Sequence, residues 1–334
     1  RRQRQMCIRD RKTHSGHISE IHVEEPWVSV RLSHTESNAQ TFPAAGKVRF
    51  GCRSWATLPS EVHTAFSEYW QPIWCRDPPP EERETPIEDG VLQLLEAIGP
   101  PLAQVTTDTC SEDVWRETLS RMKSRSSPGC CGFHVPELRL LPWPALRDLA
   151  RLFTRATSVG LPASLMRARV SLLAKIPEPQ GIGDLRPITI MATLYRAWAS
   201  TITFQLLRGW TASGRLPGGI FGGIPQRSCR DLSWDVELLL EACLNDNDSS
   251  AAGISLDLIK FFNQIPWKPL QSLLVHLGLS PDIASSWIRS LGRLTRRSSV
   301  MGSLSDEMSC TNGVPEGDPL AVPGAVAVGW ALCR

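Results

Sequence analysis

The sequence lacks several features that would assign it to a protein class at once. No two of its ten cysteines stand in the close C-x-x-C spacing of a zinc site, and a secreted disulfide scaffold would be shorter and richer in cysteine. No signal peptide opens the chain, and the longest apolar run, 319–333, is too short to span a membrane and contains Pro323. We therefore expect reduced thiols in an intracellular protein of the cytoplasm, the nucleus or both, without a membrane partner.

A strong net charge is also missing. The 36 basic and 34 acidic residues leave a net charge of +2, so composition alone does not predict a nucleic-acid partner. The basic residues are unevenly placed, however, and the segment 286–300 carries four arginines and no acid. Because a phosphate backbone responds to local basic patches, nucleic acid is not excluded. Hydrophobic residues make up 42% and charged residues 21%, which is typical of a globular protein.

Hydrophobic periodicity and linker composition organise the first part of the chain. Residues 1–60 show no sustained period, and we expect a poorly ordered segment there; residues 1–12 include MCIRDR, a run typical of a translated sequencing adapter. Residues 61–119 are predicted to be a helical region interrupted by a proline-rich, charged linker at 76–86. We place a boundary near residue 86, at the end of this linker.

Helical patterns alternate with fewer and shorter strand patterns after residue 60. This mixture predicts an α+β fold in which packed helices accompany a small antiparallel sheet. Strands are predicted at 169–176 and 251–258, and a hairpin at 296–303 and 307–312. Helices are predicted at 61–74, 87–98, 111–122, 191–209, 228–245, 267–277, 280–293 and 317–332, and one or two more over 137–158.

The most informative segment is ISLDLIKFFNQIPW, residues 254–267. A short apolar stretch delivers one carboxylate, Asp257, and the polar residues and Pro266 break the pattern soon afterwards. A buried strand that ends in an aspartate holds the carboxylate rigidly, as a metal ligand requires. A structural cap is the commoner role of such an aspartate, so the segment alone leaves both roles open.

A second segment, 172–199, places cations on both sides of a loop. Lys175 lies at the end of the predicted strand, and Arg186 precedes Pro187 after a loop rich in proline and glycine. Lysine as a point charge and arginine as a bidentate fork suit the binding of a triphosphate. The same pattern also fits a surface hairpin with two solvated cations.

A third segment, 218–232, combines four glycines with Arg227 and Arg230. Glycines allow the backbone to approach another chain closely, so the segment suits contact with a nucleic-acid backbone. An ordinary glycine-rich loop before a helix is the alternative.

The fourth segment, NGVPEGDPL at 312–320, demands a tight turn between a strand and a helix. Asp318 is predicted as the N-cap of that helix, with Pro319 at the first helical position. The turn either presents Glu316 and backbone amides to a substrate or simply connects the two elements.

In this order, these segments and a fifth at 123–138 resemble the motifs of the reverse transcriptase domain of non-LTR (LINE-type) retrotransposons. The resemblance covers roughly 120–334, and each motif is moderately specific by itself. The matching pairs are SPGCCGFHVPEL with the family's APGPDGIP, LLAKIPEP…LRPITIMATLYRAWA with LIPKP…YRPISL…YK, FGGIPQRSCRDL with GFRPGRSTxD, SLDLIKFFNQIPW with xxDLxKAFDxV, and NGVPEGDPL with GVPQGSPLSP.

The resemblance implies a right-hand polymerase, with fingers over 120–250 and part of a palm over 251–334. Such an enzyme copies an RNA template by extending a DNA primer with dNTPs. The resemblance further implies Mg²⁺, or Mn²⁺, bound by Asp257 and the backbone carbonyl of Leu258. The residues that would bind the nucleotide are Lys175, Arg186, Phe262, Glu316 and Gly317. The residues that would contact nucleic acid are Arg227, Arg230, Arg293, Arg296 and Arg297.

The sequence departs from the family's motifs in ways that bear on chemistry. Asn263 stands where Asp is usual, and Glu316 stands where Gln is common, which places an anion beside the expected triphosphate. No DD dipeptide occurs, and the chain ends at Arg334 before an aromatic-x-Asp-Asp motif and before a thumb. One aspartate cannot hold two dications, so we expect a truncated fragment that does not polymerise unless downstream codons supply that motif.

A reverse transcriptase fragment is the leading interpretation. The residues leave open a polymerase-inactive, nucleic-acid-binding remnant of a decayed element, an unrelated metal-dependent domain centred on Asp257, and a relative of group II intron or telomerase enzymes. No motif specifies the template preference or the oligomeric state.

Overall fold

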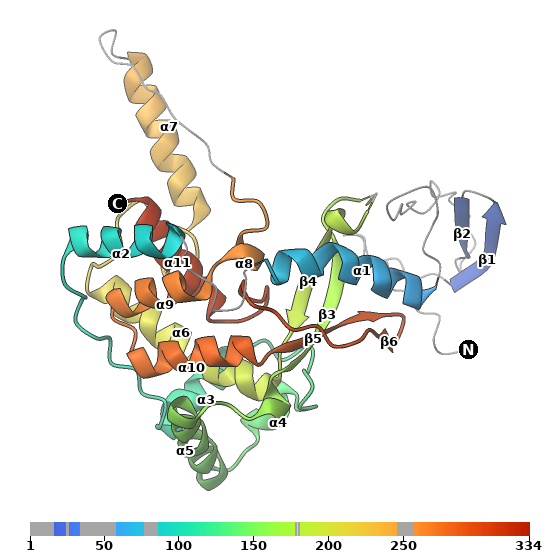
Figure 1. Ribbon diagram of the computed structural model, residues 1–334, viewed down its shortest axis with the longest axis horizontal. Helices are drawn as coiled ribbons and strands as arrows, with labels where there is room; N and C mark the ends of the chain where they lie inside the picture. Colours follow the sequence, from blue (N-terminus) through green and yellow to red (C-terminus); the bar gives the residue numbers. More distant parts are fainter. Residues whose placement is uncertain are drawn as a thin grey trace. The chain divides into compact units, whose positions relative to one another are not determined.

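The computed structural model describes two strands between residues 17 and 33, and residues 58–76, 86–177, 179, 181–245 and 257–334 (Figure 1). The chain divides into two compact units. One comprises residues 1–69 with 172–186, and the other comprises residues 70–171 with 187–334. The division into fingers and palm at residue 250 stays a prediction.

The first unit contains a hairpin in a region where the sequence shows no period. β1 (His17–Glu24) and β2 (Trp27–Ser33) pair antiparallel. The other residues up to 57 lie outside the described residues. In the same unit, Tyr69 packs on the loop that ends in a short 3-10 turn, Ile182–Asp184, because a Cβ at Gly183 would lie 2.7 Å from the Tyr69 hydroxyl oxygen.

The second unit is built mainly from helices. The division between the units falls inside helix α1 (Pro59–Trp74), which belongs to the second unit from residue 70 onward. The other helices are α2 (Pro86–Ile98), α3 (Glu112–Arg121), α4 (Val135–Arg139), α5 (Trp143–Val159), α6 (Thr193–Ala212), α7 (Cys229–Asn245), α8 (Phe261–Gln264), α9 (Trp267–His276), α10 (Pro281–Gly292) and α11 (Ala321–Leu332). A 3-10 turn, Ala163–Leu165, precedes the first strand of the sheet. The helices predicted from periodicity are confirmed; the one or two expected over 137–158 are the two helices α4 and α5, and α8 is an addition.

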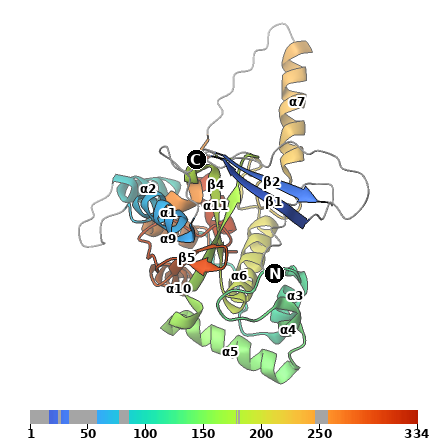
Figure 2. The ribbon, with the colours of Figure 1, turned by 90° about the vertical axis from the view of Figure 1, so that its right-hand side faces the viewer.

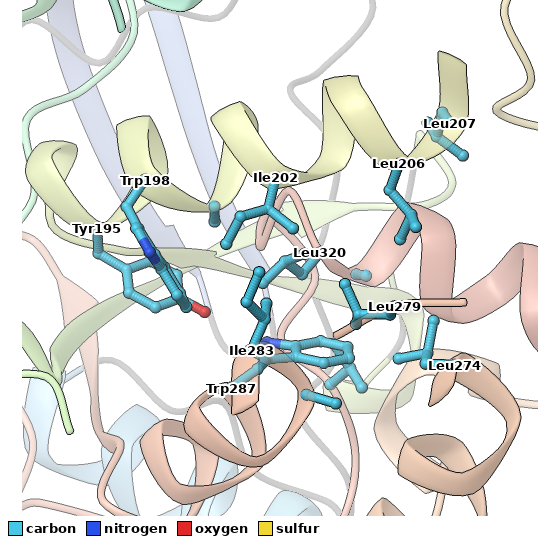
Figure 3. Packing of buried hydrophobic residues seen from close by; sticks show 14 of the residues in the cluster. Tyr195, Trp198, Ile202, Leu206, Leu207, Leu274, Leu279, Ile283, Trp287 and Leu320 are labelled. Carbon is cyan, nitrogen blue, oxygen red and sulfur yellow. The ribbon is translucent and has the colours of Figure 1, made fainter. Parts of the chain in front are cut away.

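The core of the second unit is organised around α6, which is buried along most of its length (Figure 3). Trp198 and Ile202 of α6 face Ile283 and Trp287 of α10 across this core (Figure 3). Large aromatic rings bury much apolar surface each, so these tryptophans contribute strongly to folding. Helix α6 also packs against α3 and α11, while α9 packs against α2, α10 and α11.

The sheet differs from the expected antiparallel one. Its strand order is β4 (Leu185–Ile190), β3 (Arg167–Ala174), β5 (Thr295–Val300) and β6 (Ser303–Leu304). β3 and β5 pair in parallel, so the prediction of an antiparallel sheet is wrong for this pair. Parallel pairing requires a long crossover connection, and the chain between β3 and β5 provides one that contains α6 to α10.

The predicted hairpin is present in a shorter form. β5 and β6 pair antiparallel across a turn formed by Met301 and Gly302, both with positive φ, which is the conformation of a two-residue type I′ turn. Beyond β6, the predicted second arm is reduced to an isolated bridge between Arg296 and Met308.

Helix α7 projects away from the other helices of its unit (Figure 1 and Figure 2). None of its side chains is buried, although its apolar residues recur at helical spacing as predicted. The strand predicted at 251–258 lies almost entirely outside the described residues. Among the helices that the structure describes, none combines the length and the hydrophobicity needed to cross a membrane.

The exposure of α7 predicts two different mutational costs for the same change. Leu239 of α7 is 59% exposed, whereas Leu274 of α9 is 1% exposed. Leu274→Ala should lower the free energy of unfolding by roughly 2–5 kcal/mol through loss of buried contacts, and Leu239→Ala by less than about 0.5 kcal/mol. Urea unfolding measures both. Equal losses would mean that α7 is packed in the folded protein.

Candidate functional site

The candidate site is formed where the segment after Asp257 meets the glycine- and proline-rich turn, residues 312–318, called here the 312–318 loop. The backbone amide of Gly313 donates to the carbonyl of Ile265 at 2.9 Å, and that of Val314 donates to the carbonyl of Phe262 at 2.6 Å. The indole Nε1 of Trp267 donates to the carbonyl of Gly313 at 2.7 Å. Two motifs far apart in sequence are thereby joined within the second unit.

Glycine is required at position 313 by both conformation and space. Its φ is +77°, and a Cβ there would lie 2.5 Å from the carbonyl oxygen of Asn263. Any side chain would therefore push the 312–318 loop away from α8.

Asn263 forms a buried polar link between α1 and the 312–318 loop. Its Oδ1 accepts a hydrogen bond from Nε1 of Trp74 at 2.7 Å, and its Nδ2 donates to Oε1 of Glu316 at 2.9 Å. Asn263 is 2% exposed and Trp74 is fully buried. The carbonyl of Trp74 also accepts the backbone amides of Thr311 and Asn312 at 3.0 and 3.3 Å.

The other side of the 312–318 loop is held by β4. The carbonyl of Glu316 accepts the backbone amide of Thr189 at 2.8 Å. At Gly317, φ is +120° and a Cβ would lie 2.4 Å from the carbonyl oxygen of Thr189. Gly317 itself is exposed and Glu316 is half-buried, so this part of the loop faces solvent.

Asp318 ends the loop as a buried carboxylate. Its Oδ2 accepts from the hydroxyl of Tyr195 at 2.8 Å and from Nε1 of Trp287 at 2.9 Å, and its Oδ1 accepts from the backbone amide of Leu320 at 3.0 Å. Burial raises the pKa of Asp318, opposed first by the hydrogen bonds from Trp287 and Tyr195. The carboxylate therefore links α6, α10 and the 312–318 loop.

The prediction that Asp318 caps a helix starting at Pro319 is wrong. Helix α11 begins at Ala321, and its N-cap residue is Leu320. The reason is that two buried donors, on α6 and α10, draw the carboxylate into the core.

The predicted role of Arg296 is also wrong. Its side chain is 1% exposed, and its guanidinium lies over the ring of Trp74, 4.4 Å from the ring centroid, so it does not face nucleic acid. Burial lowers the pKa of Arg296, while the nearby Cys310, Asp318, Cys75 and Glu316 act in the opposite direction. Its Nε has no hydrogen-bond partner among the described residues. The alternation of β5 turns this residue inward.

The other predicted nucleic-acid contacts differ in exposure. Arg230 and Arg293 are exposed. Arg297 is half-buried and donates from Nε to the carbonyl of Ser305 at 2.7 Å. Arg227 donates from one nitrogen, Nη1, to the carbonyls of Pro217 and Ile220, both at 2.7 Å, so it also fixes the glycine-rich loop. Their contact with nucleic acid stays a prediction.

The predicted metal ligands lie at an exposed turn. Asp257 is exposed, Leu258 is 50% exposed, and α8 follows after Lys260, which has a φ of +50°. Phe262 is half-buried and lies edge-on to Phe261, with ring centroids 5.2 Å apart. Within the part of the chain that the structure describes, no group of three or more His, Cys, Asp or Glu side chains could hold a metal ion.

The predicted triphosphate-binding cations belong to the first unit. Nζ of Lys175 donates to the carbonyl of Gly183 at 2.9 Å, and its backbone amide donates to the carbonyl of Asp184 at 2.8 Å. Lys175 and Arg186 are both exposed. Their approach to the 312–318 loop stays a prediction.

Two contributions to this site were missed by sequence reasoning. The first is Trp74, which hydrogen-bonds the asparagine of a segment far along the chain. The second is the direct pairing of Asn263 with Glu316. In the sequence, Asn263 and Glu316 are two separate departures from the family's motifs. Only the occurrence of both in one chain could have signalled that the two residues are in contact.

Comparisons with known proteins agree with the motif order. Residues 176–323 match the sequence model of the family described as Reverse transcriptase (RNA-dependent DNA polymerase). The chain is 24% identical over 79% of its length to the Transposon TX1 uncharacterized 149 kDa protein of Xenopus laevis, covering 20% of that protein. It is 25% identical over 66% of its length to the RNA-directed DNA polymerase from mobile element jockey of Drosophila melanogaster, covering 24% of it. The chain thus spans a quarter or less of these relatives.

The space around Gly313 predicts a specific sensitivity. Gly313→Ala should lower the free energy of unfolding by roughly 2–4 kcal/mol, since left-handed strain and overpacking against the carbonyl of Asn263 add together. Gly302→Ala is the matched control, because Gly302 has a φ of +84° but no atom within 4 Å of its Cβ position. That variant should lose only about 1–2 kcal/mol. Equal losses by urea unfolding would contradict the close packing of the loop on α8.

The raised pKa of Asp318 predicts the sign of a pH effect. An acid whose pKa is higher in the folded state than its ordinary value of 3.8 contributes most to stability at low pH, and this contribution is lost as pH rises through the folded pKa. Asp318→Asn cannot ionise, so its stability deficit relative to wild type should shrink as pH rises above 3.8. Unfolding free energies over a pH series test this. A deficit that grows with pH in Asp318→Asn would refute the sign.

Proposed function

Because residues 176–323 belong to the reverse transcriptase (RNA-dependent DNA polymerase) family, we propose that the chain forms the fingers and part of the palm of an RNA-directed DNA polymerase of a non-LTR retrotransposon. The observation that carries the proposal is the hydrogen-bonded junction between the segment after Asp257 and the 312–318 loop. These are the first-palm and nucleotide-loop motifs of the resemblance. Their junction places a carboxylate-bearing turn and a glycine-rich turn in one unit.

The proposed substrates are an RNA template, a DNA primer and dNTPs. The exposed Gly317 and the half-buried Glu316 and Phe262 offer a solvent-facing surface for a nucleotide. Lys175 and Arg186 are exposed in the first unit. We propose that they bind the triphosphate of the nucleotide, the lysine as a point charge and the arginine as a bidentate hydrogen-bond donor.

A nucleic-acid path along the second unit is proposed from exposed basic residues. Arg230 and Arg293 are exposed and can contact a phosphate backbone, whereas Arg297 is half-buried. Arg227 supports the glycine-rich loop before α7, so its proposed contribution is to shape that loop as well as to supply charge.

The metal requirement is only partly met by the described residues. They offer one carboxylate, Asp257, and the carbonyl of Leu258, whereas two Mg²⁺ ions need several carboxylates. The donor set present therefore does not fit a complete two-metal centre. We retain a divalent cation, Mg²⁺ by preference, as the proposed cofactor, with Asp257 as one of its ligands.

The proposal predicts that activity depends on Asp257. Asp257→Ala should lower primer extension on an RNA template with Mg²⁺ by at least about a hundredfold, the scale of losing one essential electrostatic group. The protein assayed should be the longest polypeptide that the gene encodes. Asp148→Ala on α5, an equally exposed aspartate change, should leave extension unchanged.

Undiminished extension by Asp257→Ala would refute the assignment of this carboxylate. Absence of extension in the wild type, together with RNA binding that weakens steeply with salt, would instead indicate a binding module without polymerase activity.

A further inference from the structure

The buried amide of Asn263 has partners of opposite hydrogen-bonding type. The Trp74 indole can only donate, and the carboxylate of Glu316 can only accept. An asparagine side chain offers an acceptor oxygen and a donor nitrogen, and each makes one hydrogen bond here, at 2.7 and 2.9 Å. Both polar atoms of the Asn263 amide therefore have a partner in a site where an unpaired polar group is costly.

Only some pairs of side chains satisfy this arrangement. Asparagine with glutamate does so, as observed. Aspartate with glutamine does so equally, because aspartate accepts from both the indole and the glutamine amide. Aspartate with glutamate fails, since two carboxylates would face each other at hydrogen-bond distance without a donor.

Two of the departures from the reverse transcriptase motifs fall on this pair. The motifs carry Asp at the position of Asn263 and Gln at the position of Glu316, and the chain has exchanged the carboxylate and the amide between them. Starting from the motifs' aspartate and glutamine, a glutamate at position 316 alone would leave two carboxylates, and an asparagine at position 263 alone would leave none. Together they preserve one carboxylate, one amide and the hydrogen bond that joins them.

The surroundings also favour a single carboxylate here. Arg296 of β5 is buried over the ring of Trp74, and Glu316 and Asp318 are the nearby carboxylates whose charges act on it. Asp318 already accepts three hydrogen bonds from other groups. A carboxylate at position 263 would keep the Trp74 donor but would face Glu316 with no proton between the two anions, and removal of the Glu316 charge would leave Arg296 with less compensation.

We propose that Asn263 and Glu316 form a reciprocal carboxylate–amide pair, in which Asn263 is a positioning residue that holds the Glu316 carboxylate and, through it, the 312–318 loop. The pair explains how an anion is accommodated beside the proposed triphosphate, because the Glu316 carboxylate is engaged by the amide. Only this nucleotide part rests on the proposed function; the pairing itself rests on the geometry.

A double-mutant cycle on the 334-residue chain tests the pairing without any activity. Asn263→Asp should lower the Tm by roughly 4–8 °C, because two carboxylates then face each other. Glu316→Gln should lower it less, since the two amides can still hydrogen-bond. The double variant N263D/E316Q should return to within about 2 °C of wild type.

Two exposed positions on α7 supply matched controls. Asn245→Asp and Glu237→Gln make the same chemical changes at exposed sites eight residues apart, beyond the i,i+4 spacing at which helix side chains interact, and each should shift the Tm by about 1 °C or less, with no coupling between them. A double variant N263D/E316Q that is no more stable than Asn263→Asp alone would overturn the proposal.

Calorimetric titration with dGTP and Mg²⁺ tests the nucleotide part. Asn263→Asp should weaken dGTP binding by about tenfold, through one uncompensated charge near the triphosphate, and N263D/E316Q should restore it to within about threefold. A restored Tm with binding still weakened would overturn the nucleotide role while leaving the pairing intact. If wild type binds no dGTP, the proposed function fails at this site, and the Tm cycle still decides the pairing.

Discussion

The candidate site depends on the hydrogen bonds that tie the 312–318 loop to buried side chains of the core. At one end Asn263 joins the loop to Trp74, and at the other Asp318 joins it to Tyr195 and Trp287. Buried polar groups are costly unless satisfied, and a fully satisfied network selects one conformation. The loop is therefore fixed by the same contacts that complete the core.

This constraint explains the glycines of the loop. The anchored ends bring the backbone so close to α8 and β4 that a Cβ at Gly313 or Gly317 would lie within 2.5 Å of a carbonyl oxygen. A motif that looks like a turn signal in the sequence is thus also a close-packing requirement. Gly317 is exposed and Glu316 is half-buried, so this stretch of the loop still reaches solvent.

Much of the secondary structure was predictable, because local periodicity reports burial directly. The helices of the second unit follow from apolar residues on one face, and α6 and α10 end within a few residues of their expected bounds. β4 was missed because Pro187 and the preceding loop suggested a turn. The parallel pairing of β3 with β5 was missed because the long crossover between these two strands leaves no local signal of their contact.

The sequence by itself determined the order of the motifs, their resemblance to reverse transcriptases and the residue types available for chemistry, since these are properties of the linear chain. Only the tertiary structure decided which polar side chains are buried and hydrogen-bonded within the core. Arg296 resembles its exposed neighbours in sequence yet is buried, and Asp318 resembles a helix cap yet anchors three elements. Asn263 and Glu316 are two separate departures in sequence and one hydrogen bond in space, because folding alone sets which distant groups share a desolvated site.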